Sequence, residues 1–253
     1  MNKFSKIALS VAAVLVFVGC GSDFPGQPSD TVKVNESKYS DGSIKSETPL
    51  NKENRIHGVK KEYYADGTPK LEQNYKNGAK DGVSKEYYED GTLALEQNYK
   101  NNKLYGVYKQ YYPNGNLDEV GGYDENGKIS GEFKKYNKDG VLLGEGAFKA
   151  GKKDGAFKQY NSDGVLLKEA NYKDDKLDGA EKEYNENGVL TYEGNYKNGK
   201  KDGIFKYYTN DGALVSEEGY KDDRKNGKFI EYKNGEVASE TYYENGVKQK
   251  NKQ

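Results

Sequence analysis

The chain has 253 residues, of which 33% are hydrophobic and 32% charged, and it contains 24 Tyr and 31 Gly but only 5 Pro. Its 40 basic and 41 acidic residues give a formal net charge of -1, so it lacks the basic excess of nucleic-acid-binding proteins and we expect no nucleic-acid partner. The low hydrophobic content excludes an ordinary globular core, whereas the abundant tyrosine argues against a disordered chain.

The N-terminus resembles the signal peptide of a bacterial lipoprotein. Two lysines precede an apolar stretch over residues 7–18, which as a helix of about 18 Å is too short to span a hydrocarbon core of about 30 Å. Gly19 then precedes Cys20, the only cysteine, as in a lipobox, where such a cysteine receives a diacylglyceryl group. We therefore assign residues 1–19 to a cleaved signal peptide and predict lipidation of Cys20. A plain secretory signal is the alternative.

A lipidated Cys20 would hold the mature chain at a membrane, because two or three acyl chains on one terminus anchor stably. This predicts an exported, membrane-anchored lipoprotein of the bacterial cell envelope, in the outer membrane if the host is diderm. Residues 20–37 contain two prolines among Gly, Ser and Asp, and we predict that the segment after Cys20 is a flexible tether. Residues 38–250 then form the functional part, and residues 251–253 a short tail.

The functional part repeats itself with a period of about 24 residues. Each regular repeat begins with a glycine, which is place one in the numbering used below. Tyr stands at place six, Tyr or Phe stands near place eighteen, and Asp-Gly or Asn-Gly lies between them. The place-one glycines are Gly58, Gly82, Gly106, Gly131, Gly155, Gly179, Gly203 and Gly227.

Each repeat is predicted to form a β-hairpin around its Asp-Gly or Asn-Gly pair. The sequence Tyr-Pro-Asn-Gly that ends at Gly115 favours a three-residue loop with a type I turn and a glycine bulge. A two-residue turn would place Pro113 inside a strand, where its missing N–H breaks the ladder. The three-residue loop sets Tyr160 opposite Leu166.

The first and last hairpins are predicted to have loops shortened by one residue. In the last repeat this sets Tyr232 opposite Val237, and in residues 39–47 it sets Tyr39 opposite Ile44. Atypical end repeats are expected because they cap an open stack. The register of the turn between repeats stays open.

This register predicts that Tyr at place six, Leu at place twelve and the aromatic residue at place eighteen share one face of each hairpin. One hairpin alone is not stable, so stability must come from stacking many of them. About nine hairpins predict an all-β fold, an elongated array of antiparallel β-hairpins in one twisted or curled sheet.

The pattern G-x-x-K-x-Y-x-x-D-G-x-L-x-x-E-x-x-Y-K-x-G-K resembles the variant MORN (membrane occupation and recognition nexus) repeat of bacterial proteins. The resemblance implies antiparallel hairpins packed side by side, contacts with other proteins or with membrane lipid, and no enzymatic activity. Some bacterial proteins with this repeat are labelled as antitoxins of toxin–antitoxin pairs.

The sequence contains no recognisable catalytic or metal-binding constellation. His57, the only histidine, is expected to be a solvated loop residue. Acidic pairs such as Asp174-Asp175 lack the nonapeptide rhythm of calcium-binding β-rolls, so turn chemistry explains them better. We therefore expect no enzyme, no cofactor and no metal site.

Lys recurs at place four and Glu at place fifteen, which predicts two charge ladders that keep the sheet soluble and in register. A striped docking surface is the alternative. Tyr64, Tyr88 and Tyr112 stand beside place six, on the opposite face, and predict an exposed binding patch in the N-terminal half. Later repeats carry Asn137, Asn161, Asn185 and Thr209 at this place.

Together these features predict a non-catalytic protein-binding or scaffold module held at the cell envelope. Two alternatives stay open: a glycan- or peptidoglycan-binding surface protein, and an antitoxin-like neutraliser. Export argues against the second alternative, because an exported protein does not meet a cytosolic toxin.

Overall fold

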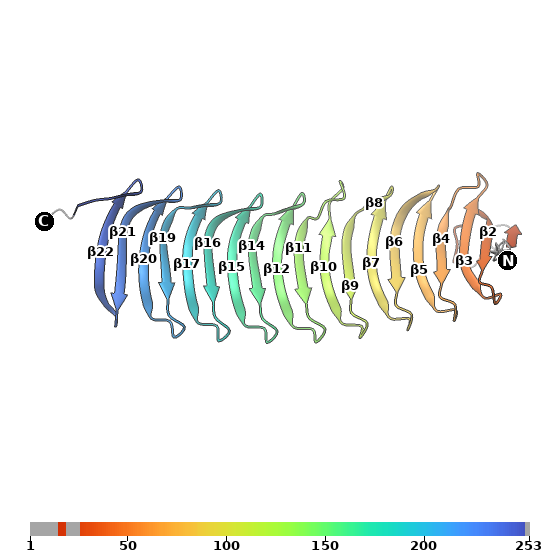
Figure 1. Ribbon diagram of the computed structural model, residues 1–253. Helices are drawn as coiled ribbons and strands as arrows, with labels where there is room; N and C mark the ends of the chain where they lie inside the picture. The colour runs from red at the N-terminus through yellow and green to blue at the C-terminus, as the bar shows by residue number, and fades with distance from the viewer. Residues whose placement is uncertain (1–14, 19–25, 251–253) are drawn as a thin grey trace, which may run out of the picture. The chain divides into compact units, whose positions relative to one another are not determined.

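The protein was analysed as a computed structural model, which describes residues 15–18 and 26–250 (Figure 1). Every regular element in these ranges is a β-strand. Cys20, the tail at residues 251–253 and most of the predicted signal peptide lie outside the described residues. The chain divides into a first half, residues 1–116 and 125–127, and a second half, residues 117–124 and 128–253.

In the first half the strands lie side by side in chain order and pair antiparallel with their neighbours, and the last two both pair with the strand that precedes them (Figure 1). They are β1 (Leu15–Val18), β2 (Thr31–Lys38), β3 (Ile44–Asn51), β4 (Gly58–Tyr63), β5 (Pro69–Lys76), β6 (Ala79–Tyr87), β7 (Leu93–Lys100), β8 (Lys103–Leu104) and β9 (Gly106–Tyr111).

The second half follows the same plan. Its strands are β10 (Leu117–Tyr123), β11 (Gly131–Tyr136), β12 (Leu142–Lys149), β13 (Lys152–Lys153), β14 (Gly155–Tyr160), β15 (Leu166–Lys173), β16 (Lys176–Tyr184), β17 (Leu190–Lys197), β18 (Lys200–Lys201), β19 (Gly203–Tyr208), β20 (Leu214–Lys221), β21 (Arg224–Lys233), β22 (Glu236–Glu244) and β23 (Val247–Lys248). The predicted all-β array of antiparallel hairpins is confirmed.

The hairpin loops have the predicted register. Tyr160 lies opposite Leu166 with a bulge beside it, and Gly164 has the left-handed φ of 82° that this loop requires. In the shortened last repeat Tyr232 lies opposite Val237, also as predicted.

The first hairpin differs from the prediction in length and register. Residues 31–37 belong to β2, so the assignment of residues 20–37 to a flexible tether is wrong for these residues, and Thr31 is fully buried. The alternating sequence Thr-Val-Lys-Val extends as a strand because β3 offers it a partner along its whole length. Lys38, and not Tyr39, lies opposite Ile44. The loop therefore has its full length, and Tyr39 occupies place seven.

Six turns between repeats, whose register the sequence left open, are two-residue turns with left-handed φ at both positions, whereas the turns at residues 52–54 and 125–127 are longer. Asp174 and Asp175 have φ of 49° and 68°, the conformation of a type I′ turn. The Asp175 N–H donates to the Lys153 carbonyl (3.0 Å), and Asp175 Oδ1 accepts from the Lys153 N–H (2.8 Å). The acidic residue thus joins two successive turns, which supports its interpretation as turn chemistry.

The two recurrent aromatic places lie on opposite faces of the sheet, so the prediction that they share one face is wrong. Gly58 pairs with Tyr75, so place eighteen lies on the same face as place one. Lys61 pairs with Glu72, so place fifteen lies on the same face as place four. Side chains alternate along each strand. Places three, five, fourteen, sixteen and eighteen therefore form one face, here called the aromatic face. Places two, four, six, fifteen and seventeen form the ladder face.

Contacts within the ladder face support its predicted structural role. The Tyr208 hydroxyl donates to Glu193 (2.8 Å) of the preceding repeat. Lys206 Nζ lies 3.5 Å from Glu193 and 3.8 Å from Glu217, on the strands either side. Tyr63, Tyr87, Tyr160, Tyr184 and Tyr232 donate to glutamates in the same way. Lysine, glutamate and tyrosine therefore satisfy one another from repeat to repeat.

Candidate docking face

On the aromatic face of the second half, rings from places three and eighteen pack edge to face along the sheet. Phe157 lies 5.3 Å from both Phe148 and Tyr172, measured between ring centroids. Phe205 lies 5.3 Å from both Tyr196 and Tyr220. Phe229 continues this row to Tyr243 at 4.8 Å. Such contacts stabilise beyond the area that they bury.

Three lysines stand over these rings. Lys153 Nζ is 4.9 Å from the centroids of Phe157 and Tyr172. Lys201 Nζ is 4.6 Å from Phe205 and 4.7 Å from Tyr220. The third, Lys225, lies in the same way over Phe229 and Tyr243. Each lysine precedes the place-one glycine by two residues, so the repeat itself spaces these cation–π contacts.

Small residues under the rings allow this packing. Gly194 is the cross-strand neighbour of Phe205, and a Cβ atom at Gly194 would lie 2.3 Å from two ring carbons. Gly146 has the same relation to Phe157. The ring thus lies flat on the glycine, a device that stabilises glycine in strands.

Replacing Gly194 with alanine should therefore lower the free energy of unfolding by about 1–3 kcal/mol, the cost of forcing a core ring from its place. Urea unfolding followed by far-UV circular dichroism measures the loss. In a Phe205→Ala background, Gly194→Ala should not lower the free energy of unfolding further. An equal loss in both backgrounds would show that the ring is not the cause.

A buried ion pair interrupts the aromatic row. Place three is Glu181 in this repeat, and its side chain is only 7% exposed. Lys168 Nζ lies 2.5 Å from Glu181 and 2.8 Å from Glu183. Burial alone lowers the pKa of Lys168, but its hydrogen bonds to the two carboxylates outweigh this and raise the pKa above its ordinary value.

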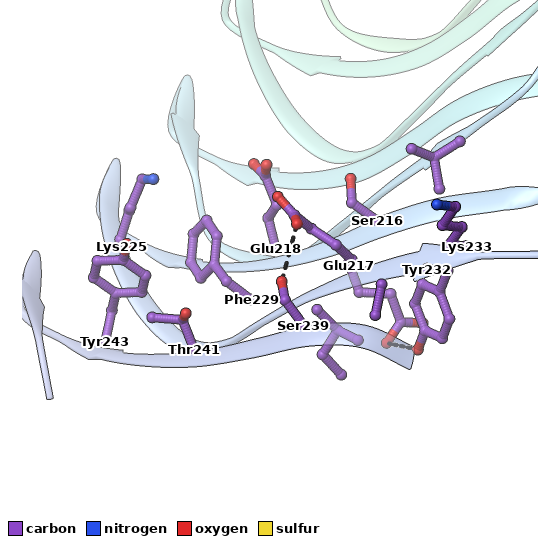
Figure 2. Close-up of a pocket in the computed structure, with 14 residues that line it drawn as sticks. Ser216, Glu217, Glu218, Lys225, Phe229, Tyr232, Lys233, Ser239, Thr241 and Tyr243 are labelled. Carbon is purple, nitrogen blue, oxygen red and sulfur yellow. Dashed lines mark hydrogen bonds between the residues drawn. The ribbon is translucent and has the colours of Figure 1, made fainter. Parts of the chain in front are cut away.

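A hollow of about 530 Å³ lies over β20–β22 (Figure 2). Short polar side chains, Ser216, Ser239 and Thr241, line it. The Ser239 hydroxyl donates to Glu231 (2.9 Å), and Figure 2 shows Lys225 beside the Phe229 and Tyr243 rings. Aromatic rings, glutamate carboxylates and lysine ammonium groups thus line the same hollow.

The predicted tyrosine patch is not an exposed surface. Tyr64, Tyr88 and Tyr112 are half-buried. The Tyr64 hydroxyl donates to the Tyr87 carbonyl and the Tyr88 hydroxyl to the Tyr111 carbonyl, both at 2.7 Å. Tyr39 donates to the Tyr63 carbonyl in the same way. Tyr39, Tyr64 and Tyr88 thus join successive repeats. Binding of a partner by Tyr64, Tyr88 and Tyr112 stays a prediction.

Place seven has a different role in the second half. Asn161 Oδ1 accepts from the N–H groups of Asp163 (3.0 Å) and Val165 (2.9 Å), so it stabilises its own loop. Asn137, Asn185 and Thr209 also accept from backbone N–H groups of their own loops. The change from tyrosine thus adds a bond within the loop, while Asn185 also keeps one between repeats, because its Nδ2 donates to the Asn210 carbonyl (2.8 Å).

His57 is packed, and its prediction as a solvated loop residue is wrong. Its side chain is 12% exposed, with Nε2 3.2 Å from Asp30 Oδ1. Its Nδ1 accepts from the Asn77 N–H (3.2 Å). The unexpected strand β2 accounts for this, because Asp30 precedes it directly.

Within residues 15–18 and 26–250, no group of three or more His, Cys, Asp or Glu side chains is placed to hold a metal ion. The same part of the chain contains no helix of the length and apolar character needed to cross a bilayer.

The raised pKa values of half-buried tyrosines predict that the fold is lost in alkali. Burial and the hydrogen bond to Glu72 raise the pKa of Tyr87 from 10.0 to about 12, and burial and Glu193 do the same for Tyr208. Because the folded chain favours the neutral phenol, this stabilisation is complete below pH 10 and is lost as the pH rises from about 10 through 12. Circular dichroism and tyrosinate absorbance should change together over this range. Ionisation near pH 10 without loss of structure would contradict this prediction.

Six segments of the chain match the family model described as MORN repeat variant: residues 56–77, 80–101, 104–121, 153–174, 177–198 and 201–222. They cover just over half of the chain, and each begins two residues before a place-one glycine. A search of curated proteins gave no match.

Proposed function

Because the chain belongs to the MORN repeat variant family, with which a protein-binding or scaffold role is consistent, we propose that it is a non-catalytic module that binds a protein partner through its aromatic face. The observation that carries this proposal is the contrast between the two faces. On the ladder face the same lysine, glutamate and tyrosine recur and satisfy one another. A surface on which lysine, glutamate and tyrosine recur in most repeats and pair with one another is a framework.

The aromatic face changes from repeat to repeat. At place fourteen the second half carries Gly144, Lys168, Tyr192 and Ser216, and at place five it carries Lys135, Gln159, Glu183 and Tyr207. Tyr and Phe are enriched at protein interfaces, and Tyr is enriched among the residues that contribute most to binding. The repeat thus supplies the frame, and these places supply an irregular surface.

The finer proposal is that Cys20 holds this module at the bacterial cell envelope as an exported lipoprotein, in the outer membrane if the host is diderm. The apolar stretch before Gly19-Cys20 supports it. Labelled palmitate should enter the wild-type chain and not a Cys20→Ser variant, which should leave the membrane fraction. A Cys20→Ser chain that stays membrane-bound would overturn the anchor and leave the docking face intact.

Neighbouring residues on opposite faces provide the test of the docking face. Gln159 and Lys158 are both exposed, and they stand at place five of the aromatic face and place four of the ladder face. A photo-crosslinking amino acid placed at Gln159 in intact cells should give a discrete protein adduct, identified by mass spectrometry, and the same group at Lys158 should not. Equal adducts from both positions, or none, would overturn the proposal. A glycan adduct would favour the glycan-binding alternative, and a cytosolic toxin would favour the antitoxin-like one.

A further inference from the structure

An apolar hollow of about 200 Å³ opens on the aromatic face of the second half beside Gly144. Phe133, Phe157, Ala170 and Tyr172 line it. It exists because place fourteen has no side chain in this repeat, whereas the same place holds Leu71 and Leu95 in the first half and Tyr192 farther along the second. This hollow is called the Gly144 notch below.

The fold does not require the notch to be empty. A Cβ atom at Gly144 would meet the Lys158 carbonyl oxygen at 3.5 Å, an ordinary contact, and the backbone there is not left-handed. At Gly146, two residues on, a Cβ atom would lie 2.3 Å from the Phe157 ring. Gly146 therefore has a packing role, and Gly144 has none that the structure shows.

Size and chemistry define what the notch would hold. Cofactor and drug-sized pockets begin at about 300 Å³, whereas an apolar cavity of about 150 Å³ holds a benzene molecule. The notch of about 200 Å³ thus suits one large apolar side chain. A protein interface fills such a pocket with a single anchor residue.

The charge at the rim comes from Lys153. Its ammonium lies over Phe157 and Tyr172, at 4.9 Å from each, and forms no ion pair with the described residues. Lys168 also lines the notch, but Glu181 and Glu183 neutralise it. The Glu145 carboxylate accepts from Tyr160 on the ladder face. A partner carboxylate beside the anchor would therefore find one unpaired cation.

We propose that the Gly144 notch receives a phenylalanine- or leucine-sized side chain of a protein partner, with an adjacent partner carboxylate paired to Lys153. This inference rests on the proposed protein-binding function and names the chemistry of the segment that is bound.

The test uses a phage-displayed random peptide library panned against the purified full-length chain. Enriched peptides should place Phe, Leu or Trp next to Asp or Glu. A synthetic peptide from this set should bind a Gly144→Leu variant at least tenfold more weakly by isothermal titration, because leucine fills the notch as Leu71 and Leu95 fill the same place elsewhere. Lys153→Gln should weaken acidic peptides and spare their neutral analogues.

Ala156→Leu is the matched control, since Ala156 is exposed at place two on the ladder face of the same hairpin, and binding should be unchanged. Gly144→Leu must also unfold at the wild-type urea midpoint. Equal binding of the peptide to wild type and Gly144→Leu would overturn the proposed role of the notch. The absence of enriched peptides that combine apolar and acidic residues would overturn it as well. If the Gln159 crosslink to a protein then persists in Gly144→Leu, the proposed function survives this failure. If Gln159 gives no protein crosslink even in the otherwise wild-type chain, the proposed function itself is wrong.

Discussion

Replacing Phe205 with alanine should lower the free energy of unfolding by about 3–5 kcal/mol, the usual cost of truncating a fully buried phenylalanine. Phe205 has no solvent exposure. It makes edge-to-face contacts with Tyr196 and Tyr220 and lies under the Lys201 ammonium at 4.6 Å. A single-layer sheet has no second layer that could collapse into the cavity, so truncation loses these contacts together.

Urea unfolding followed by far-UV circular dichroism measures this effect. Ile204 is the matched control, because it precedes Phe205 directly, stands on the other face and is 57% exposed. Ile204→Ala should change the free energy of unfolding by less than about 0.5 kcal/mol. A similar loss from both substitutions would mean that strand propensity, and not the aromatic row, stabilises this part of the array.

The local structure of the hairpins could be predicted from the sequence because short-range chemistry determines it. Pro113 excluded a two-residue loop in its hairpin, and the Asp-Gly and Asn-Gly pairs located the hairpin loops. The register that sets Tyr160 opposite Leu166 follows from these residues alone. The register of the first hairpin was predicted wrongly because Tyr39 was aligned with the place-six tyrosines, whereas its hydroxyl bonds as those of place seven do.

The arrangement of the faces was predicted wrongly because each hairpin carries a bulge beside its loop. Gln159 lies opposite Lys168 and Tyr160 opposite Leu166, so Leu167 has no partner and the alternation of side chains shifts by one along the second strand. The turn between repeats could not be predicted either, because it contains several residues able to adopt left-handed φ. One signal was nevertheless present in the sequence. Gly146 precedes Phe157, and Gly194 precedes Phe205, by the same eleven residues. A glycine so spaced from a phenylalanine indicates a ring lying on a cross-strand glycine.

The aromatic row is interrupted at Glu181, where the residue on the neighbouring strand is not glycine. The residue eleven places before Glu181 is Ala170, which is 4% exposed. The same place in the next repeat is Gly194, which leaves room for the Phe205 ring, whereas the Ala170 methyl group takes up this room beside Glu181. A longer, flexible side chain at place three can avoid that methyl group, but a carboxylate there needs a cation, and Lys168 supplies it. In this repeat an alanine and an ion pair thus stand where the next repeat has a glycine and a phenylalanine.

Removing this cation should have the second large effect on stability. Lys168→Met keeps the length of the side chain but leaves Glu181 buried and unpaired, which costs about 3–5 kcal/mol in a fully buried pair. Because the Lys168 side chain is 35% exposed, solvent screens part of this interaction, and we expect a loss of about 2–3 kcal/mol in the free energy of unfolding. Urea unfolding at neutral pH measures it.

The double variant Lys168→Met with Glu181→Gln identifies the cause. A neutral amide removes the uncompensated charge and can still accept from the Tyr192 hydroxyl, which lies 3.5 Å from Glu181, so most of the lost stability should return. Glu183→Gln alone is the control, because its side chain is 47% exposed and its loss should cost less than about 0.5 kcal/mol. If Lys168→Met is neutral and the second change adds nothing, water or the neighbouring tyrosines already solvate Glu181. The interruption of the aromatic row would then be a polar opening in the docking face and not a closed ion pair.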